Sequence, residues 1–523
     1  CLTGSSPFPW QQALFARFIG LASERFPSTC GLPTGVGKTS VIAIWLLALA
    51  HYAAAGKPRE FPRRLVYVVN RRTVVDQATA EAVALRRALG ARTELRHIAD
   101  ALRSLSADPR LRDSPLAVST LRGQFADNAE WRDDPACPAV VVGTVDMIGS
   151  RLLFSGYGRG FKSRPLHAAF LGHDALLVHD EAHLEPAFQA AVERIEREQS
   201  LYEKERGRFR VIALSATSRS GENVFRLTER DYAHPEVSRR VAASKALAFH
   251  SVEDPKGVPA KVVDLALSDA VRTSGRAVLV FLRELKHVAY VCEQLKKSKQ
   301  SVQVLTGTLR GYERDALATS DEIFARFLPS SDQSKGEGTV YLVSTSAGEV
   351  GVNISADDLI CDVTPFDSMA QRFGRVNRFG LRPAHIDVVT AVGSSEPEPP
   401  YAKAQFRTEQ LLRTLPKCAD DPSRLNASPS ALNDLDAEAR IAAFTPSPTI
   451  LPISDVLFDA WAMTTLRSLP GRPPVAPFLH GIAEWEPPYT SVAWRREVEE
   501  ITEDKLSLHP PDELLEDYPL KPH

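Results

Sequence analysis

Short, nearly unbroken apolar runs recur along the first part of the chain, and helical stretches separate them. Strands of a parallel sheet have this pattern, because helices cover both faces of such a sheet and leave it no polar face. We therefore predict a parallel α/β sheet within residues 30–240. Its expected strands are RRLVYVVN (63–70), PAVVVGTVDM (138–147), DALLVHDE (174–181) and FRVIALSAT (209–217).

A second series of apolar runs follows, again with helical segments such as ELKHVAYVCEQLKK (284–297) between them. The alternation of strand and helix predicts a second α/β sheet of similar size. The expected strands of this second sheet are RAVLVFLR (276–283), SVQVLTG (301–307), GTVYLVSTS (338–346), DLICDV (358–363) and HIDVVTA (385–391).

The pattern ends near GSSEPEPP (393–400), and about half of the 37 prolines lie beyond that point. Since proline interrupts regular elements, we predict loops and short helices there. An appendage that packs on the other domains is the favoured interpretation of this region, and a catalytic unit is the alternative. The expected organisation is a first domain at 1–240, a second domain at 241–395 and a Pro-rich C-terminal accessory region at 396–523.

Composition narrows the classes of protein. A chain of 523 residues exceeds what one hydrophobic core supports, so we expect several domains. The formal net charge is −2, so no global positive field attracts nucleic acid, and any such site has to be local. The six cysteines form no Cys-x-x-Cys pair, so we expect no zinc site and a reducing, cytoplasmic environment. No membrane association is expected, because SVIAIWLLALA (40–50) has about half the length of a membrane span.

The segment LPTGVGKTS (32–40) precedes this apolar helix and has the pattern of a phosphate-binding loop. Glycines let backbone N–H groups turn inward around phosphates, a lysine reaches the β- and γ-phosphate oxygens, and a threonine hydroxyl holds a magnesium ion. The alternative is a glycine-rich turn that caps a helix. The predicted ATP-binding residues in this loop are Thr34, Gly35, Gly37, Lys38 and Thr39, although Leu32 replaces the usual first small residue.

The apolar strand of LLVHDEAHLEP (176–186) ends abruptly in two carboxylates and a histidine. Beside a phosphate loop these charges gain partners, namely a bound metal ion and a triphosphate. We expect Asp180 to complete the magnesium shell begun by Thr39, and Glu181 to orient and deprotonate the attacking water. His183 is expected to transmit the nucleotide state to the second sheet. A solvated strand end is the alternative interpretation.

Two further motifs flank this site. In FPWQQALF (8–15), the side-chain amide of Gln11 suits the N7 acceptor and N6 donor of adenine, with Gln12 as the less favoured neighbour. In the segment LSAT (214–217), Ser215 and Thr217 are expected to couple hydrolysis to the strand-binding surface, or else to act as local caps.

The segment QRFGRVNRFG (371–380) places three polar side chains at spacings of four and three, which predicts one side of a helix. We expect Gln371, Arg375 and Arg378 to act at the γ-phosphate, since arginine provides fixed positive forks for developing charge. A solvated helix face is the alternative. The preceding loop, with Gly348, Glu349 and Gly351, follows a strand of the second sheet and is expected to face the first, with Gly351 contacting ATP. Two sheets that share one nucleotide site describe a motor.

These motifs, in this order from Gln11 to Arg378, resemble those of superfamily 2 helicases of the DEAH type. The resemblance narrows to the helicase part of the CRISPR-associated helicase–nuclease of type I interference, and within it to type I-U, also called I-G. The segments that carry it are VYVVNRRTVVDQ (66–77), STLRGQF (119–125), VGTVDMIGSRLLFSGYG (142–158), and EVGVN (349–353) with QRFGRVNRFG.

What the resemblance implies is a fold of two tandem RecA-like parallel-sheet domains, with ATP and Mg²⁺ as cofactors. It also implies ATP-driven 3′-to-5′ movement along single-stranded DNA, after an RNA-guided surveillance complex has opened the target duplex and recruited the motor. The family's strand-contacting motifs fall on this chain at Arg71, Arg72, Arg122, Thr144 and Thr345. Arginines and hydroxyls contact phosphate without reading sequence, although a solvated strand end would also account for Arg71 and Arg72.

The chain departs from the family pattern at Asn353, where the family often has Asp, and at Ser346, which replaces a glutamine-containing form. These changes weaken ribose or water contacts and leave the acid pair and phosphate loop intact. We expect Asp146 to cap or position a neighbour rather than to contact DNA.

The nuclease half of the family needs a metal-binding His-Asp constellation. The sequence has two His-Asp pairs, at 173–174 and 179–180, but both lie at the strand that ends in the acid pair, and Asp180 is already assigned. We therefore expect no nuclease activity in this segment. The chain starts without a methionine, and we interpret it as part of a longer polypeptide, in which a nuclease domain can follow residue 523 or belong to a partner. Two alternatives stay open: a generic DEAH-type RNA or DNA-repair helicase, and a nucleotide-gated recruitment module without translocation.

Overall fold

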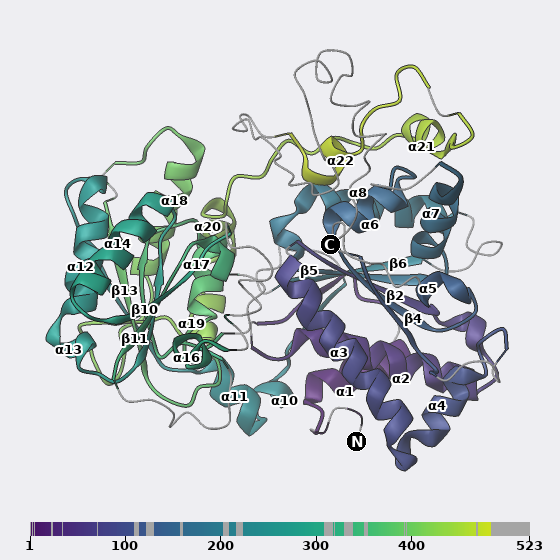
Figure 1. Ribbon diagram of the computed structural model, residues 1–523, viewed down its shortest axis with the longest axis horizontal. Coiled ribbons are helices and arrows are strands. Elements are labelled where there is room, and N and C mark those ends of the chain that lie inside the picture. Colours follow the sequence, from purple (N-terminus) through teal and green to yellow (C-terminus); the bar gives the residue numbers. More distant parts are fainter. Residues whose placement is uncertain are drawn as a thin grey trace, which may run out of the picture.

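The protein is represented by a computed structural model (Figure 1). It describes residues 2, 4, 6–21, 25–33, 35–70, 72–108, 114–121, 130–156, 161–201, 209–215, 223–307, 317, 320–328, 338–349, 354–391, 393, 395–466 and 469–482, with the side chains of 72–74 and 347 excluded.

The first sheet has strand order β3-β4-β2-β5-β6-β1-β7, and every strand pair in its described part is parallel. β2, β4 and β5 are buried almost along their whole length, as the unbroken apolar runs predict. The strands are β1 (Thr29–Gly31), β2 (Arg64–Val69), β3 (Ala117–Leu121), β4 (Ala139–Thr144), β5 (Ala175–Asp180), β6 (Phe209–Ser215) and β7 (Val224–Arg226).

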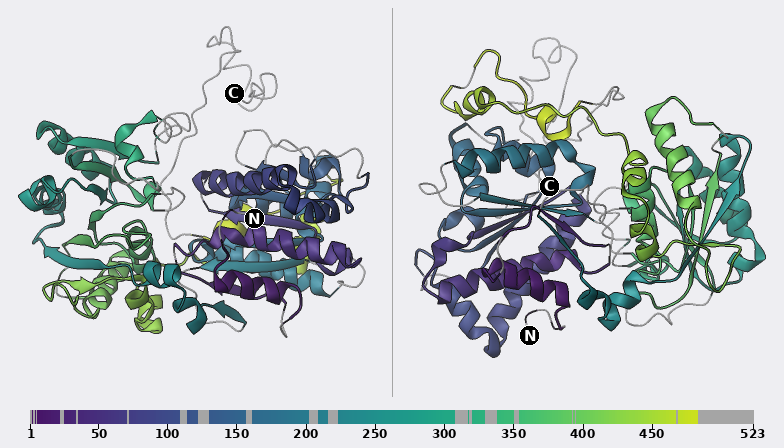
Figure 2. Two further views of the ribbon diagram at one scale, coloured as in Figure 1. Left: turned by 90° about the horizontal axis from the view of Figure 1, so that it is seen from below. Right: turned by 180° about the vertical axis from the view of Figure 1, so that it is seen from behind.

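Helices cover both faces of this sheet, and each face has its own apolar core (Figures 1 and 2). One face carries α1 (Pro9–Phe18), α2 (Val41–Ala54), α3 (Arg72–Ala91) and α4 (Arg96–Arg103). The other face carries α5 (Glu130–Asp133), α6 (Val145–Leu152), α7 (Arg164–Gly172) and α8 (Pro186–Ser200).

The second sheet has strand order β10-β11-β9-β12-β13-β8-β14. It is parallel except for β14, which pairs antiparallel with β8. The strands are β8 (Lys245–Ser251), β9 (Ala277–Phe281), β10 (Ser301–Leu305), β11 (Val340–Ser344), β12 (Asp358–Asp362), β13 (Ala384–Thr390) and β14 (Leu425–Asn426).

Two more apolar cores lie on the faces of this second sheet. One contains α12 (Val258–Leu267) and α14 (Leu285–Lys297), next to α13 (Asp269–Arg272). The other contains α16 (Glu322–Ala325), α17 (Phe366–Phe373), α18 (Pro400–Arg413), α19 (Pro429–Asn433) and α20 (Ala437–Ala442). The predicted α/β architecture of two parallel-sheet domains is thereby confirmed.

Each predicted strand is present with both ends at most three residues from the expected ones, but β1, β3, β7, β8 and β14 were not predicted. β8 is the most consequential omission, because it lies inside the sheet between β13 and β14. The region after residue 396 also contains the 14-residue helix α18, longer than the short helices expected there. No helix in the described ranges combines the length and the apolar character that a bilayer crossing needs.

The chain crosses between the two domains twice. The first crossing follows β7 and contains α10 (Glu229–Tyr232) and α11 (Pro235–Val241). The second leaves α20 and returns to the first domain, where α21 (Asp455–Ala462) and α22 (Ala476–His480) join the core beneath α6 and α8. Figure 1 shows the two crossings at opposite edges of the molecule, and the rear view of Figure 2 agrees. The domain limits at 240 and 395 stay predictions.

Candidate functional site

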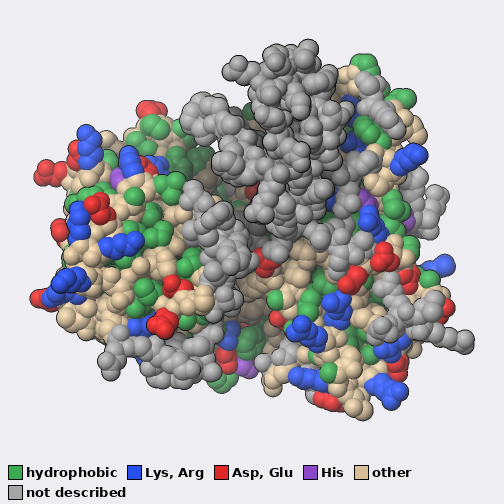
Figure 3. Space-filling model, in the orientation of Figure 1, with side chains coloured by type: hydrophobic (Ala, Val, Ile, Leu, Met, Phe, Trp, Pro, Cys, Tyr) green, Lys and Arg blue, Asp and Glu red, His purple; other side chains and the backbone are tan. Residues whose placement is uncertain are grey.

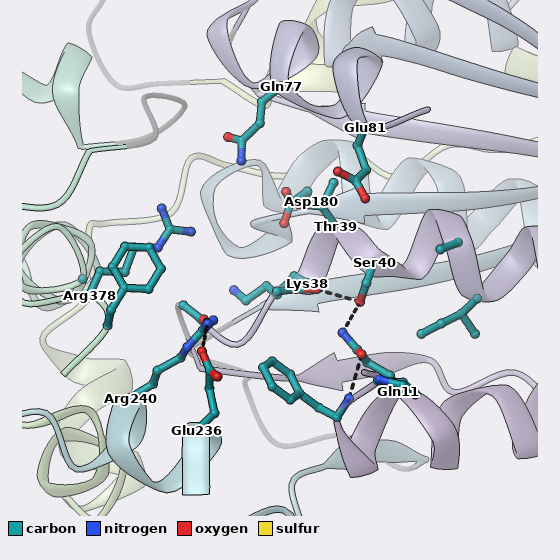
Figure 4. A pocket seen from close by; sticks show the side chains of 18 of the residues that line it. Gln11, Lys38, Thr39, Ser40, Gln77, Glu81, Asp180, Glu236, Arg240 and Arg378 are labelled. Atoms are coloured by element: carbon teal, nitrogen blue, oxygen red, sulfur yellow. Dashed lines mark hydrogen bonds and ion pairs between the residues drawn. The ribbon is translucent and has the colours of Figure 1, made fainter. Parts of the chain in front are cut away.

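A cavity of about 870 Å³ lies between the two domains, and both of them line it. The first domain provides Lys38, Asp180 and Glu181, and the second provides Arg375 and Arg378. Figure 4 shows side chains from both domains directed into this space. Elsewhere on the described part of the face in Figure 3, acidic and basic side chains are interspersed, as the small net charge predicts. The candidate site is therefore a local feature of the cleft.

The predicted phosphate loop turns at the end of β1 and leads into α2 through a short 3-10 helix, η1 (Lys38–Ser40). Gly35 and Gly37 have φ values of +89° and +82°, which side chains with a Cβ rarely adopt, so glycine is required at both. Thr34 lies outside the described residues. The loop thus has the backbone conformation that directs N–H groups toward an anion at the start of a helix.

The acid pair lies beside this loop at the end of β5. Glu181 Oε1 is 3.0 Å from the Nζ atom of Lys38, and both side chains are largely buried. Burial favours the neutral form of Glu181, but the charges of Lys38 and His183 outweigh it and lower its pKa. Glu181 is therefore ionised, and within the described residues its Oε2 atom accepts no hydrogen bond. An ionised carboxylate with a spare oxygen can orient a water molecule.

Asp180 has a different environment from its neighbour. The Tyr67 hydroxyl donates to Asp180 Oδ2 at 2.8 Å, and the Glu181 backbone N–H donates to Oδ1 at 3.0 Å. Burial and the adjacent Glu181 charge raise the pKa of Asp180 to about 6. Thr39 lines the same cavity, and its side chain also hydrogen-bonds with Tyr67. Two oxygen ligands of this kind, one of them a buried carboxylate in need of positive charge, fit Mg²⁺.

Sequence reasoning missed Tyr67. A tyrosine in the middle of a strand that is otherwise apolar is the signal that could have found it, because a buried hydroxyl needs a hydrogen-bond partner. The pKa of Tyr67 is raised well above its usual value by burial and by Asp180, so the hydroxyl keeps its proton and donates.

His183 follows the acid pair in the 3-10 helix η5 (Ala182–Leu184). Its Nδ1 atom lies 3.1 Å from Ser215 Oγ at the end of β6 and 3.6 Å from Glu181 Oε2. The structure therefore brings together His183 and Ser215, two of the residues assigned to coupling, next to Glu181. Thr217 lies outside the described residues.

Gln11 is fixed beside the phosphate loop. Its amide Nε2 donates to Ser40 Oγ at 2.8 Å, and its Oε1 accepts from the Phe8 backbone N–H at 2.9 Å. Gln12 instead donates to the Pro7 carbonyl at the protein surface. These contacts connect the segment at the start of α1 with η1. Gln11 and Gln12 both line the cavity, and the choice of Gln11 stays a prediction.

Gln371, Arg375 and Arg378 all line the cavity, but they do not share a helix face, and the prediction of a common helix is wrong. α17 ends at Phe373, because Gly374 begins a turn that carries both arginines out of the helix. Arg375 Nε donates to the Glu349 backbone carbonyl at 2.8 Å, and burial together with Arg378 lowers the pKa of Arg375 to about 9.

Arg378 lies close to the phosphate loop. A Cβ atom placed on Gly35 would lie 3.4 Å from the Arg378 carbonyl oxygen and 3.5 Å from its Cγ atom, so the two loops approach each other closely across the domains. The Arg378 guanidinium is directed into the cavity (Figure 4). Gly351, the other predicted ATP contact in this domain, lies outside the described residues.

Arg372, in the same motif, was assigned no role and has a structural one. Its guanidinium is 1% exposed and pairs with Glu349 Oε1 at 2.7 Å and with Asp362 Oδ1 at 2.8 Å. Ser368 donates to the second Glu349 oxygen at 2.8 Å. The two carboxylates outweigh burial and raise the pKa of Arg372, so the network is fully charged. It fixes Glu349, whose carbonyl in turn holds Arg375.

Sequence reasoning also missed Arg240, on α11 in the first crossing. Its guanidinium donates to the Gly35 carbonyl at 2.7 Å and pairs with Glu236 (Figure 4). It also lies over the rings of Phe8 and Phe379, at 5.4 and 5.3 Å from their centroids. One side chain thus contacts the N-terminal segment, the phosphate loop and the second domain. Gln77 and Glu81, from α3, also face the cavity without having been predicted.

Thr144 and Thr345, two of the residues predicted to contact nucleic acid, are not among the described residues that line this cavity. Thr144 caps α6, where its hydroxyl accepts from the Met147 N–H at 3.4 Å. Thr345 follows β11 and is buried. Both lie at the carboxyl ends of parallel strands. Arg71 and Arg122 lie outside the described residues, as does the side chain of Arg72, which begins α3.

Residues 274–380 match a family model described as "CRISPR-associated nuclease/helicase Cas3, C-terminal". Cas3 from T. fusca bound to AMPPNP has a similar fold, with a TM-score of 0.57 and 17% identity over 82% of this chain and 52% of that chain. Cas3 from T. fusca bound to ADP gives a TM-score of 0.57 and 18% identity over 84% and 54%. The chain thus spans about half the length of these two proteins. No curated protein sequence matches it.

The predicted resemblance to the CRISPR-associated helicase–nuclease is confirmed in sequence over residues 274–380 and in fold over most of the chain, and subtype I-U or I-G stays a prediction. The matched segment contains β9 to β12, the Arg372 network and the two cavity arginines. In fold over most of its length, and in sequence over residues 274–380, the chain is similar to the CRISPR-associated nuclease/helicase Cas3.

Proposed function

We propose that this chain is an ATP-dependent helicase that moves 3′ to 5′ along single-stranded DNA in CRISPR interference. The observation that carries the proposal is the composition of the cavity. A lysine and two carboxylates of one domain face two arginines of the other, across a glycine loop with anion-binding conformation. The similarity to Cas3, which is known bound to AMPPNP and to ADP, supports ATP as the nucleotide.

The phosphates would bind at the loop. Gly35 and Gly37 would present backbone N–H groups, and Lys38 would exchange Glu181 for the β- and γ-phosphate oxygens. That exchange releases Glu181 to accept a proton from water, whose oxygen attacks the γ-phosphorus as the bond to ADP breaks. Thr39 and Asp180 would hold Mg²⁺, which neutralises phosphate charge. Gln11 would read the adenine edge.

The second domain would complete the site only when the cleft is closed. Arg375 and Arg378 are expected to stabilise the charge on the leaving γ-phosphate, with Gln371 beside the attacking water. The Arg378 backbone already lies close to the phosphate loop at Gly35, so a small rotation would suffice to engage the two arginines. His183 and Ser215 would report the state of Glu181 to the strand-binding surface. ATP-driven closure and product-driven opening would then move the strand.

The partners follow from the same proposal. The DNA strand would run over the carboxyl ends of the strands, past Thr144 and Thr345, with Arg71, Arg72 and Arg122 at its phosphates. An RNA-guided surveillance complex would recruit the motor to opened target DNA in the cytoplasm, and a nuclease domain or partner would cut the strand.

ATP hydrolysis measured without nucleic acid, with single-stranded DNA and with single-stranded RNA tests the proposal. We expect stimulation by DNA and its loss in Lys38→Ala. Stimulation by RNA alone would indicate a generic RNA helicase instead. A Glu181→Gln variant that binds ATP and DNA and still supports full interference would indicate a recruitment module. Absence of any stimulation in the unsubstituted chain would remove the translocase.

A further inference from the structure

The second crossing between the domains is short and is fixed at both ends. On the second domain, the Thr445 backbone N–H and hydroxyl both donate to Asp367 Oδ1 at 2.9 Å, at the start of α17. On the first domain, Leu451 packs against the core beneath α6 and α8, in which Ile453 is buried. Even fully extended, the six peptide steps from Thr445 to Leu451 reach roughly 20 Å. We call residues 446–450 the strap.

The end of the chain beyond the strap is well packed on the first domain. Trp461, Phe478 and Leu479 are buried in the same core as Phe188 of α8. α22 comes so close to α6 that a Cβ atom on Gly149 would lie 2.6 Å from Leu479 Cδ2. Arg194 of α8 also pairs with Asp455 at the start of α21. Burying these large side chains holds α21 and α22 firmly in place.

The strap is itself joined to the end of α22. The Thr449 N–H donates to the Ile482 carbonyl at 2.9 Å, and the Ile482 N–H donates back to the Thr449 carbonyl at 2.9 Å. Gly481, with φ of +76°, makes the reversal that brings these backbones together, against Pro448. Tension in the strap would therefore be transmitted to the backbone next to His480.

His480 bridges two elements of the first domain. Its Nε2 atom lies 2.8 Å from Asp146 Oδ1, and its Nδ1 atom lies 3.5 Å from Glu185 Oε2. Hydrogen bonds to both carboxylates raise the pKa of His480 to about 10, so the ring is a cation that donates to both. Asp146 is in the first turn of α6, two residues after Thr144, and Glu185 follows the acid pair at the start of α8.

We propose that His480 is a positioning residue that holds the start of α6, and that the strap makes this contact respond to the position of the second domain. The chain from Asp367 through Thr445, the strap and Ile482 to Asp146 is continuous in bonded contacts. It lies at the edge opposite α11, so opening of the cleft about α11 would tighten it (Figure 1). The role in catalysis rests on the proposed function, because Thr144 is an expected DNA contact.

Two variants of the full chain separate the strap from its anchor. An insertion of about ten Gly and Ser residues between Pro446 and Ser447 slackens the strap without touching α22. The same insertion between Ala419 and Asp420, in an exposed turn of the second domain, is the control of equal length. His480→Gln removes the cation, and His480→Arg restores one. The matched control is His385→Gln, which removes a histidine of β13 that is paired with Asp358.

The expected enzymatic result is weaker coupling between DNA binding and ATP hydrolysis. The slack strap and His480→Gln should each lower the stimulation of ATP hydrolysis by single-stranded DNA about fivefold or more, without altering hydrolysis in the absence of DNA. His480→Arg should recover most of the stimulation, and both controls should behave as the parent. Full stimulation with the slack strap, or an equal loss in the control insertion, would overturn the proposal.

Small-angle X-ray scattering of the nucleotide-free protein provides a readout that does not depend on ATP hydrolysis. The slack strap should increase the radius of gyration and broaden the distribution of interatomic distances relative to the control insertion, which adds the same mass. Identical scattering curves for the two insertions would refute the proposed role of the strap, whatever the result of the ATP hydrolysis measurements. A parent without DNA-stimulated hydrolysis would refute the proposed function, and the scattering comparison would still decide the strap.

Discussion

The Lys38–Glu181 pair is the residue-scale feature on which the proposed chemistry depends. Glu181→Gln keeps the volume of the side chain but removes the proton acceptor. Because positioned general bases contribute about 10²- to 10⁴-fold, ATP hydrolysis should fall by that factor while ATP affinity is retained. Steady-state hydrolysis and equilibrium binding of a fluorescent ATP analogue measure the two quantities. Glu193→Gln, at an exposed position on α8, should leave both at the parental level.

Arg372 leads to a prediction about stability. Arg372→Met should cost about 3–5 kcal/mol in the unfolding free energy of the second domain, because Glu349 and Asp362 would stay buried without their cation. Urea unfolding followed by the secondary-structure signal measures this loss. Lys297→Ala removes an exposed pair with Glu293 and should leave the unfolding free energy close to that of the parent, because solvent screens such a pair. Equal effects of the two substitutions would mean that the buried network contributes no more to the unfolding free energy than an exposed ion pair does.

At this scale the sequence predicted the residues whose chemistry is carried by a local motif. The phosphate loop and the acid pair need only their own neighbours to be recognised, and both line the cavity. Arg372 and Arg375, by contrast, are three residues apart in one motif and have opposite surroundings, a buried ion pair and a cavity wall. Which arginine faces which way depends on where α17 ends. Tyr67 and Arg240 depend on contacts between distant segments, which no local pattern encodes.

At the scale of elements, strands buried on both faces were predictable because burial leaves them uniformly apolar. β8 was missed since KALAFHS mixes polar with apolar positions, and its neighbours rather than its composition make it a strand inside the sheet. β1 has three residues, too few for any periodicity. Helix ends were equally hard to predict. The spacing of Gln371, Arg375 and Arg378 fits a helix, and the turn at Gly374 ends it.

The packing of α22 on α6 leads to a prediction at the element scale. Gly149→Ala should loosen α22, because the added methyl group would lie 2.6 Å from Leu479 in a close-packed contact. A cost of about 1–3 kcal/mol is expected for such overpacking, more than helix propensity gains. Hydrogen exchange in residues 476–482 should rise accordingly. Gly90→Ala, near the end of α3 with no atom within 4 Å of the new methyl, should leave exchange unchanged or slightly lower.

At the scale of the whole molecule, the two domains are joined by two crossings rather than one, and no sequence pattern indicated this arrangement. Proline-rich composition after residue 396 predicted loops and short helices, and it carries no information about which domain this region packs against. The region after residue 396 first adds β14 to the second sheet, and the segment that returns after α20 then adds α21 and α22 to the first domain. The cleft that holds the candidate site is therefore bounded by covalent connections at both of its edges.

The docking of the returning segment should depend on pH. Bonds to Asp146 and Glu185 raise the pKa of His480 from 6.5 to about 10, so its charge stabilises the docked state fully below pH 6.5 and loses that effect as pH rises through 10. Since His480 and Asp146 are partly exposed, solvent screening limits the contribution to about 1 kcal/mol.

Hydrogen exchange of residues 476–482, corrected for the intrinsic effect of pH, measures this loss between pH 7 and 10. His480→Gln should already show the faster exchange at pH 7 and respond little to further alkalinisation, so parent and variant should converge near pH 10. A parent that stays as protected at pH 10 as at pH 7, with the variant equally protected, would mean that apolar contacts alone hold α22. The second crossing would then be a passive connection, because its attachment would not pass through the start of α6.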